Sequence, residues 1–156
     1  LLPKITFRSA TPADDPLIAQ HFHQMWLDNQ VPVECLQPNW LAQTLQFIAQ
    51  ARQNLGYQAF LSEVHAQIVG SVSAQRFTGL YPVIFTPSYR QDGYIWGVYV
   101  EPVYREQGIA TELTRLAIEH LKTLGCTRAV LNASPSGRPV YEKLGFGSNN
   151  AMTLSL

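Results

Sequence analysis

The sequence predicts a single α/β (α+β) domain that covers residues 1–156. Three observations lead to this class. Segments that alternate apolar and polar residues are interleaved with segments whose apolar residues recur at helical spacing. Gly and Pro separate these segments. The chain has 156 residues, which are too few for two ordinary domains, and its 46% of hydrophobic residues is enough for one buried core.

The first half of the chain predicts one strand, two helices and a hairpin. Residues 5–8 alternate as a short strand, and a helix is expected to begin near Asp15 after the turn at 11–16. A second amphipathic helix follows Pro38. Residues 57–64 and 67–77 are rich in β-forming residues and have a short polar link, which predicts an antiparallel hairpin.

The second half predicts a central strand, a long helix and three shorter elements. Residues 93–100 are dense in Tyr, Ile, Trp and Val, as in a strand covered on both faces. Residues 108–124 carry a helical apolar stripe that Gly125 should end. A strand at 128–133, a short helix at 139–144 and a last strand at 151–156 complete the series.

The composition narrows the classes of partner. Lys plus Arg and Asp plus Glu number 11 each, so no net charge would draw the protein to nucleic acid or to an anionic membrane. No stretch reaches the ~18 apolar residues of a membrane span. Cys35 and Cys126 are too few for a disulfide framework, and no Cys/His spacing indicates a metal site. We therefore expect a cytoplasmic protein, and the 14% of charged residues together with the last strand leave room for a homodimer.

The turn before the long helix favours anion binding. A strand that ends at Val100, a loop with Pro102 and a helix that opens at Gly108 leave backbone N–H groups unpaired at the helix N-terminus. These donors and the helix dipole attract phosphate, Gly108 allows close approach, and Arg105 adds a cation. A glycine at a helix start is more often ordinary loop chemistry, so the turn needs support from the surrounding sequence.

That support comes from motifs along the chain. VYVEP at 98–102, leading into REQGIA at 105–110, resembles the acetyl-CoA-binding motif of the GNAT superfamily of N-acetyltransferases. Residues 134–146, which end in YEKLGF, resemble the later motif of that family, and residues 5–14 are similar to its opening. Neither the Rossmann GxGxxG nor the P-loop pattern is present. Residues 20–92 match the family only by their pattern of elements.

The resemblance implies a mixed, mostly antiparallel sheet of six or seven strands flanked by about four helices. The sheet would be splayed between its fourth and fifth strands, here 93–100 and 128–133, so that the pantetheine of acetyl-CoA lies in the gap. The backbone of the fourth strand would bond to pantetheine, and amides 107–111 would hold the pyrophosphate. The implied coenzyme-binding residues are Val98, Tyr99, Val100, Arg105, Gln107, Gly108, Ile109, Ala110, Thr111, Asn132 and Ser134.

Three of the implied site residues carry alternatives. Tyr141 matches the tyrosine commonly assigned as the general acid to the departing thiolate, and the alternative is an ordinary packed tyrosine. Ser134 stands where the family frequently has Asn, which puts a contact with pantetheine there in doubt. Asn132 could reach the coenzyme or the acceptor, or could only make a strand-end hydrogen bond.

The acceptor side is less specified. An alkyl amine with a pKa near 10.4 is neutral in only about one molecule in 2,000 at pH 7, so a base or a selective site must help. The fourth strand has no carboxylate where many family members have Glu. Four residues remain as base candidates, each with the alternative of a solvated surface group: Asp92, Glu34, His21 and His23.

Aromatic residues are numerous enough to line an apolar acceptor pocket, although core packing is the default for at least half of them. They are Trp26, Trp40, Tyr81, Phe85, Tyr89, Tyr94 and Trp96. The apolar segment 78–91 could cover such a pocket.

The resemblance therefore implies acetyl transfer from acetyl-CoA to a primary amine of a small molecule, by direct attack in a ternary complex. Neither cysteine has an evident His partner, which disfavours an acyl-enzyme. The alternative from another class is a non-catalytic acyl-CoA-binding or sensor domain.

Overall fold

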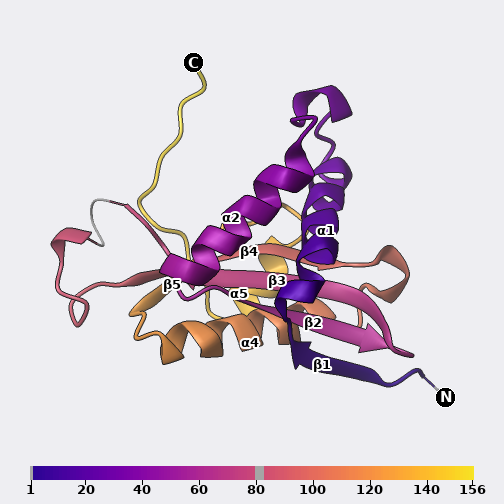
Figure 1. Cartoon of the computed structure of the whole chain (residues 1–156). Helices are drawn as coiled ribbons and strands as arrows, with labels where there is room; N and C mark the ends of the chain where they lie inside the picture. Colours follow the sequence, from indigo (N-terminus) through magenta and orange to yellow (C-terminus); the bar gives the residue numbers. More distant parts are fainter. Residues whose placement is uncertain (1, 80–82) are drawn as a thin grey trace.

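A five-stranded mixed sheet forms the centre of the protein, in the spatial order β1-β2-β3-β4-β5 (Figure 1). The structure is a computed structural model that describes residues 2–79 and 83–156. The strands are β1 (Ile5–Ser9), β2 (Gln58–Val64), β3 (Gln67–Arg76), β4 (Asp92–Val100) and β5 (Arg128–Val130). Neighbouring strands from β1 to β4 are antiparallel, and β5 is parallel to β4. The predicted α/β class and the hairpin β2–β3 are confirmed.

Helices cover both faces of the sheet (Figure 1). On one face lie α1 (Asp15–Asp28) and α2 (Trp40–Asn54), and on the other lies α4 (Ile109–Thr123). Shorter helices are η1 (Pro12–Asp14), η2 (Val33–Cys35), η3 (Pro102–Tyr104) and α5 (Arg138–Lys143). No helix in the described part of the chain is long and apolar enough to cross a bilayer.

The strand β4 separates two cores, as its two-sided apolar sequence predicts. Ile95 packs with Leu113 and Ala117 on the α4 side, and Trp96 packs with Ile18 and Ile48 on the side of α1 and α2. Because successive side chains of a strand point to opposite faces, β4 is buried from both sides and is held rigidly.

The sheet opens between β4 and β5. The two strands pair only from Asp92, Gly93 and Tyr94 to Arg128, Ala129 and Val130, while β4 continues to Val100. The predicted strand 128–133 is therefore too long, because residues 131–133 diverge from β4 and have no ladder partner there. The backbone edge of β4 beyond Tyr94 faces the resulting cleft.

The predicted last strand at 151–156 is wrong. These residues are extended but belong to no strand, and the segment leaves the body of the protein beside the loop that connects β3 and β4 (Figure 1). An alternating sequence becomes a strand only where a neighbouring strand can complete its hydrogen bonds, and no strand of the described chain lies beside this segment. The sheet therefore has five strands where six or seven were predicted.

Candidate functional site

One large pocket, of about 1290 Å³, follows β4 along the opening between β4 and β5. Its walls come from α1 and α2 at one end and from the first turn of α4 at the other. The predicted site residues that line it are Val98, Tyr99, Val100, Arg105, Gly108, Ile109, Ala110, Thr111, Asn132, Ser134 and Tyr141. Gln107 is the predicted coenzyme residue that does not line the pocket.

The first turn of α4 offers free N–H donors to the pocket. Gly108 is the N-cap residue and has a φ of +81°, and no side chain caps the helix. In the described chain, residues 2–79 and 83–156, no acceptor pairs with the amides of Gln107, Gly108, Ile109, Ala110 and Thr111. A Cβ at Gly108 would meet no atom within 4 Å, so the space above this turn is open. Free amides at a helix N-terminus beside open space suit a diphosphate.

The Arg105 side chain has partners within the protein. Its Nε donates to the carbonyl oxygen of Val100 at 2.8 Å, and its Nη2 donates to Asp28 at 2.9 Å. The guanidinium also lies 5.6 Å from the ring centroid of Tyr99. A carbonyl oxygen has two lone pairs, so Val100 retains one for another donor. The predicted cation is thus at the pocket, where it is already paired with a carboxylate.

A bulge in β4 brings main-chain groups into the pocket wall. Ser71 pairs with Tyr99 and Ser73 with Trp96, so two residues, Gly97 and Val98, oppose the single residue between the serines. Gly97 has a φ of +66°, which a glycine adopts without steric cost. Such a bulge leaves polar backbone groups outside the ladder, and both bulge residues line the pocket.

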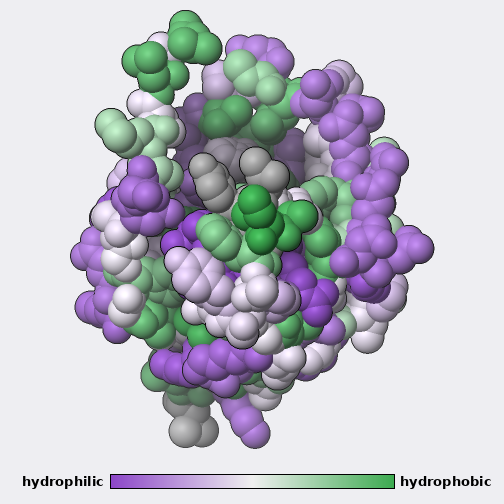
Figure 2. Space-filling model, turned by 90° about the vertical axis from the view of Figure 1, so that its left-hand side faces the viewer, coloured by the Kyte–Doolittle hydropathy of each residue, from purple (hydrophilic) through white to green (hydrophobic). Residues whose placement is uncertain are grey.

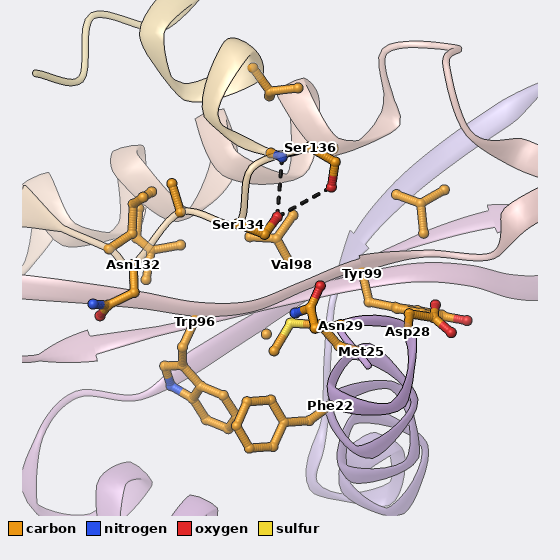
Figure 3. Close-up of a pocket in the computed structure, with 18 of the residues that line it drawn as sticks. Phe22, Met25, Asp28, Asn29, Trp96, Val98, Tyr99, Asn132, Ser134 and Ser136 are labelled. Atoms are coloured by element: carbon orange, nitrogen blue, oxygen red, sulfur yellow. Dashed lines mark hydrogen bonds between the residues drawn. The ribbon is translucent and has the colours of Figure 1, made fainter. Parts of the chain in front are cut away.

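Asn132 and Ser134 lie across β4 from Phe22 and Trp96 (Figure 3). Asn132 Oδ1 accepts a hydrogen bond of 2.8 Å from the Tyr94 hydroxyl, which leaves the Asn132 amide hydrogens as donors. Ser134 Oγ accepts a hydrogen bond of 3.1 Å from the amide of Gly137 at the start of α5. The serine at this position therefore holds the loop that leads into α5, the helix that carries Tyr141.

Tyr141 is held on α5 with its ring against Phe146, 6.0 Å between centroids. Burial raises the pKa of its hydroxyl above the ordinary value of 10.0. Tyr141 therefore stays protonated at neutral pH and can donate a hydrogen bond into the pocket.

The four base candidates do not line the pocket. Asp92 is buried at the start of β4, where burial alone would raise its pKa, but hydrogen bonds from Arg128 and Arg90 lower it overall. His21 is buried against Ser71, and burial lowers its pKa to about 4. His23 stacks on Trp40, and Glu34 lies on η2. The structure therefore brings none of the four predicted base candidates into the lining of this pocket.

The aromatic residues named as candidates for an acceptor pocket are divided by the structure. Trp26, Tyr94 and Trp96 line the pocket, whereas Trp40, Phe85 and Tyr89 do not. Tyr81 lies outside the described residues.

Several further lining residues were not predicted as site residues, among them Phe22, Met25, Asp28 and Phe47. Phe22 and Met25 follow the helical stripe of α1, and a helical period does not distinguish a core face from a pocket face. Phe47 carries no sequence signal of its own, and it lines the pocket because α2 packs beside Trp96.

Comparison with known proteins bears on this site. The model of the "Acetyltransferase (GNAT) family" matches residues 19–146. A protein from Trypanosoma brucei brucei named glucosamine 6-phosphate N-acetyltransferase is 35% identical over 101 residues, which are 64% of this chain and 65% of that protein. The match thus spans less than two thirds of the relative's length.

Two solved structures cover nearly the whole chain. A GCN5-related N-acetyltransferase from Ralstonia eutropha JMP134 has a TM-score of 0.84 at 21% identity, over 98% of this chain and 99% of that one. A predicted acetyltransferase with acetyl-CoA from Clostridium acetobutylicum has a TM-score of 0.80 at 25% identity, over 98% of this chain and 96% of that one. The described fold is therefore shared along its length.

Proposed function

This chain belongs to the acetyltransferase (GNAT) family, and on that premise we propose that it transfers the acetyl group of acetyl-CoA to the primary amine of a small molecule. The observation that carries the proposal is that one pocket joins the free amides of the α4 turn to Tyr141. A diphosphate at the turn and a thioester near Tyr141 would place the donor along the open edge of β4. The acceptor would then enter from the end formed by α1 and α2.

When bound, acetyl-CoA supplies an electrophilic carbonyl carbon and a thiolate leaving group. Amides of Gly108, Ile109, Ala110 and Thr111 would bind its diphosphate. Unpaired N–H groups at the β4 bulge would be available to the thioester oxygen, whose negative charge grows during attack. Neither Cys35 nor Cys126 lines the pocket, so no cysteine is placed to form an acyl-enzyme. This supports direct attack by the amine in a ternary complex.

Tyr141 would act as a hydrogen-bond donor to the leaving sulfur. A thiol has a pKa near 8.5 and an ordinary phenol has one near 10, so complete proton transfer to the thiolate is uphill by roughly 2 kcal/mol. Burial of Tyr141 raises its pKa further and enlarges that cost. Stabilisation of the thiolate without full transfer is the role that this environment supports.

The acceptor is the less constrained partner. The name of the Trypanosoma relative makes a hexosamine phosphate one candidate acceptor for this chain. The residues at the acceptor end of the pocket support a different acceptor.

Self-association is a separate proposal. Met152, Leu154 and Leu156 are exposed, and the C-terminal segment projects with hydrophobic (green) side chains beside a hollow in the surface (Figure 2). Covering these side chains against a second copy would remove apolar surface from water. Light scattering at micromolar concentration would reveal a dimer mass, and a monomer mass would rule out a stable dimer.

Two measurements test the acetyl-transfer proposal. Acetyl-CoA at a hundredfold excess over Kd should add about 2.7 kcal/mol of stability and raise the Tm, because it binds only the folded state. A panel of primary amines should then produce thiol release that depends on both amine and protein. An unmoved Tm would contradict the donor assignment. A raised Tm without thiol release from any amine would indicate instead a non-catalytic acyl-CoA-binding domain.

A further inference from the structure

Aromatic rings from three elements form the acceptor end of the pocket. These rings, here called the aromatic wall, belong to Phe22 and Trp26 of α1, Phe47 of α2, and Tyr94 and Trp96 of β4. Phe22 meets the Trp96 ring edge-on with centroids 4.9 Å apart, as Figure 3 shows, and Phe47 meets it at 5.7 Å. The indole N–H of Trp96 donates to Gln75 at 2.7 Å, which holds the centre of the wall in place.

Two rings of this wall are largely exposed to water. Trp26 is 39% exposed and Phe47 is 47% exposed, although both lie in a concave site. Trp96, between α1 and α2, is only 9% exposed and forms the floor. A ligand with an apolar surface would remove the exposed rings from water, and ring edges and faces favour a flat partner.

Charge in the described lining is concentrated where the C-terminal end of α1 meets the loop before α4. Among the described residues that line the pocket, the charged ones are Asp28, Arg105 and Glu106. Glu106 precedes the α4 turn, and Asp28 and Arg105 pair with one another at 2.9 Å. A phosphate on the acceptor, with a charge near −2, would thus lie against the wall without a cation.

The polar groups near the aromatic wall are uncharged and partly committed. Thr44 donates its hydroxyl hydrogen to the carbonyl oxygen of Trp40 at 2.7 Å, and Asn132 Oδ1 accepts from Tyr94. Gln43 is another uncharged polar residue of the lining. These groups can orient a neutral hydrogen-bonding substituent, but they cannot offset a carboxylate.

From these observations, and resting on the proposed acetyl transfer, we propose that the acceptor is a primary amine carried by a flat aromatic body that bears neither phosphate nor carboxylate. The same apolar surroundings would help to supply the amine in its neutral form, although no predicted base candidate lines the pocket. Transfer from water to apolar surroundings disfavours an ammonium ion, so the wall selects the neutral amine that attacks the thioester. The aromatic wall thus determines both the choice of acceptor and its protonation state.

Three amines test the proposal in the thiol-release assay. The probe 2-phenylethylamine has the proposed chemistry, phenylalanine adds a carboxylate to it, and glucosamine 6-phosphate replaces the ring by a phosphorylated sugar. We expect kcat/KM for 2-phenylethylamine to exceed that of each of the other two by about a hundredfold or more, since an uncompensated buried charge is costly. Equal or better use of either charged amine would overturn the proposal.

Variants locate the effect on the wall. Phe47→Ala should raise KM for 2-phenylethylamine about tenfold or more and leave KM for acetyl-CoA unchanged, because a buried ring face is lost only from the acceptor site. Phe47→Leu, which keeps apolar volume, should restore part of the loss. Tyr89→Ala is the matched control, since Tyr89 is 72% exposed and does not line the pocket. An unchanged KM for 2-phenylethylamine in Phe47→Ala would also overturn the proposal.

A binding measurement separates this proposal from the proposed function. Calorimetry of 2-phenylethylamine with the protein saturated by CoA needs no turnover. Binding that Phe47→Ala weakens would support the aromatic acceptor site even if no amine gave thiol release, an outcome that would count against catalysis alone. Absence of binding, or tighter binding of glucosamine 6-phosphate, would overturn the aromatic assignment while leaving acetyl transfer to another amine intact.

Discussion

Arg105 bonds to Asp28 across the mouth of the pocket, with 2.9 Å between Nη2 and Oδ2. The pair joins the C-terminal end of α1 to the loop before α4, two segments that are 77 positions apart. Hydrogen bonds from Gln24 and then from Arg105 lower the pKa of Asp28, so the carboxylate is charged at neutral pH. A bound diphosphate would compete with Asp28 for the same guanidinium.

The first prediction is that Asp28→Asn tightens CoA binding by two- to fivefold at low salt. The carboxylate repels the diphosphate and holds Arg105, but both side chains are partly exposed, so the effect is worth no more than about 1 kcal/mol. Calorimetry at low and high salt measures it, with Glu119→Gln in an exposed pair on α4 as the control. Weaker binding in Asp28→Asn would show that the pair instead positions Arg105 for the coenzyme.

The second prediction compares two glycines at opposite ends of α4. Gly108 and Gly125 have φ values of +81° and +78°, and a Cβ at either would meet nothing within 4 Å. Alanine at either position should therefore lower the free energy of unfolding by a similar amount, roughly 1–2 kcal/mol. Only Gly108→Ala should also weaken CoA binding, by about tenfold or more, because its Cβ would enter the space above the free amides. Denaturant melts and calorimetry measure the two effects, and equal affinities in the two variants would argue against a diphosphate at this turn.

The third prediction compares the hydroxyl of half-buried Tyr141 with that of buried Tyr57. Tyr141→Phe should lower kcat about 10²- to 10⁴-fold and spare CoA affinity, because the hydroxyl acts only as the carbon–sulfur bond breaks. Tyr57→Phe should instead lower the Tm, because the Tyr57 hydroxyl forms a hydrogen bond of 2.8 Å with the Ser73 hydroxyl. Tyr57 does not line the pocket, so its loss should leave kcat unchanged. A kcat for Tyr141→Phe equal to that of the unsubstituted protein, in an assay limited by chemistry, would remove Tyr141 from the leaving-group role.

The fourth prediction concerns His21 and acid stability. Burial lowers the pKa of His21 from 6.5 to about 4 despite the Glu101 carboxylate 3.6 Å away. Between these values the unfolded chain binds a proton that the folded chain does not, so stability is complete above about pH 6.5 and falls as the pH drops toward 4. The loss is on the order of 3 kcal/mol. Denaturant melts from pH 7 to 4 should show that the free energy of unfolding falls less in His21→Asn than in the unsubstituted protein. His23→Asn serves as the control. Parallel losses in His21→Asn and the unsubstituted protein would contradict the assignment.

The sequence by itself determined the local elements and the anion-binding character of the turn before α4. Periodicity located α1, α2 and α4, the hairpin β2–β3 and the two-sided strand β4, because each pattern repeats over neighbouring residues. The turn before α4 could also be predicted from the sequence, because its free amides, Gly108 and Arg105 all lie within positions 100–111. Tyr141 was identified by its motif, and the structure places it in the wall of the same pocket.

The tertiary structure decided whatever depends on a partner distant in sequence. Residues 151–156 alternate as a strand should, yet form none, because hydrogen bonds between strands need a neighbour that local sequence does not reveal. Phe47 reads as an unremarkable helix position and becomes part of a site only because α2 packs beside Trp96. Asp28 and Arg105 are likewise ordinary charges until the fold brings them to 2.9 Å. Local periodicity reports which way a side chain points along its own element, whereas a binding site depends on which elements meet, and that is set by packing of the whole chain.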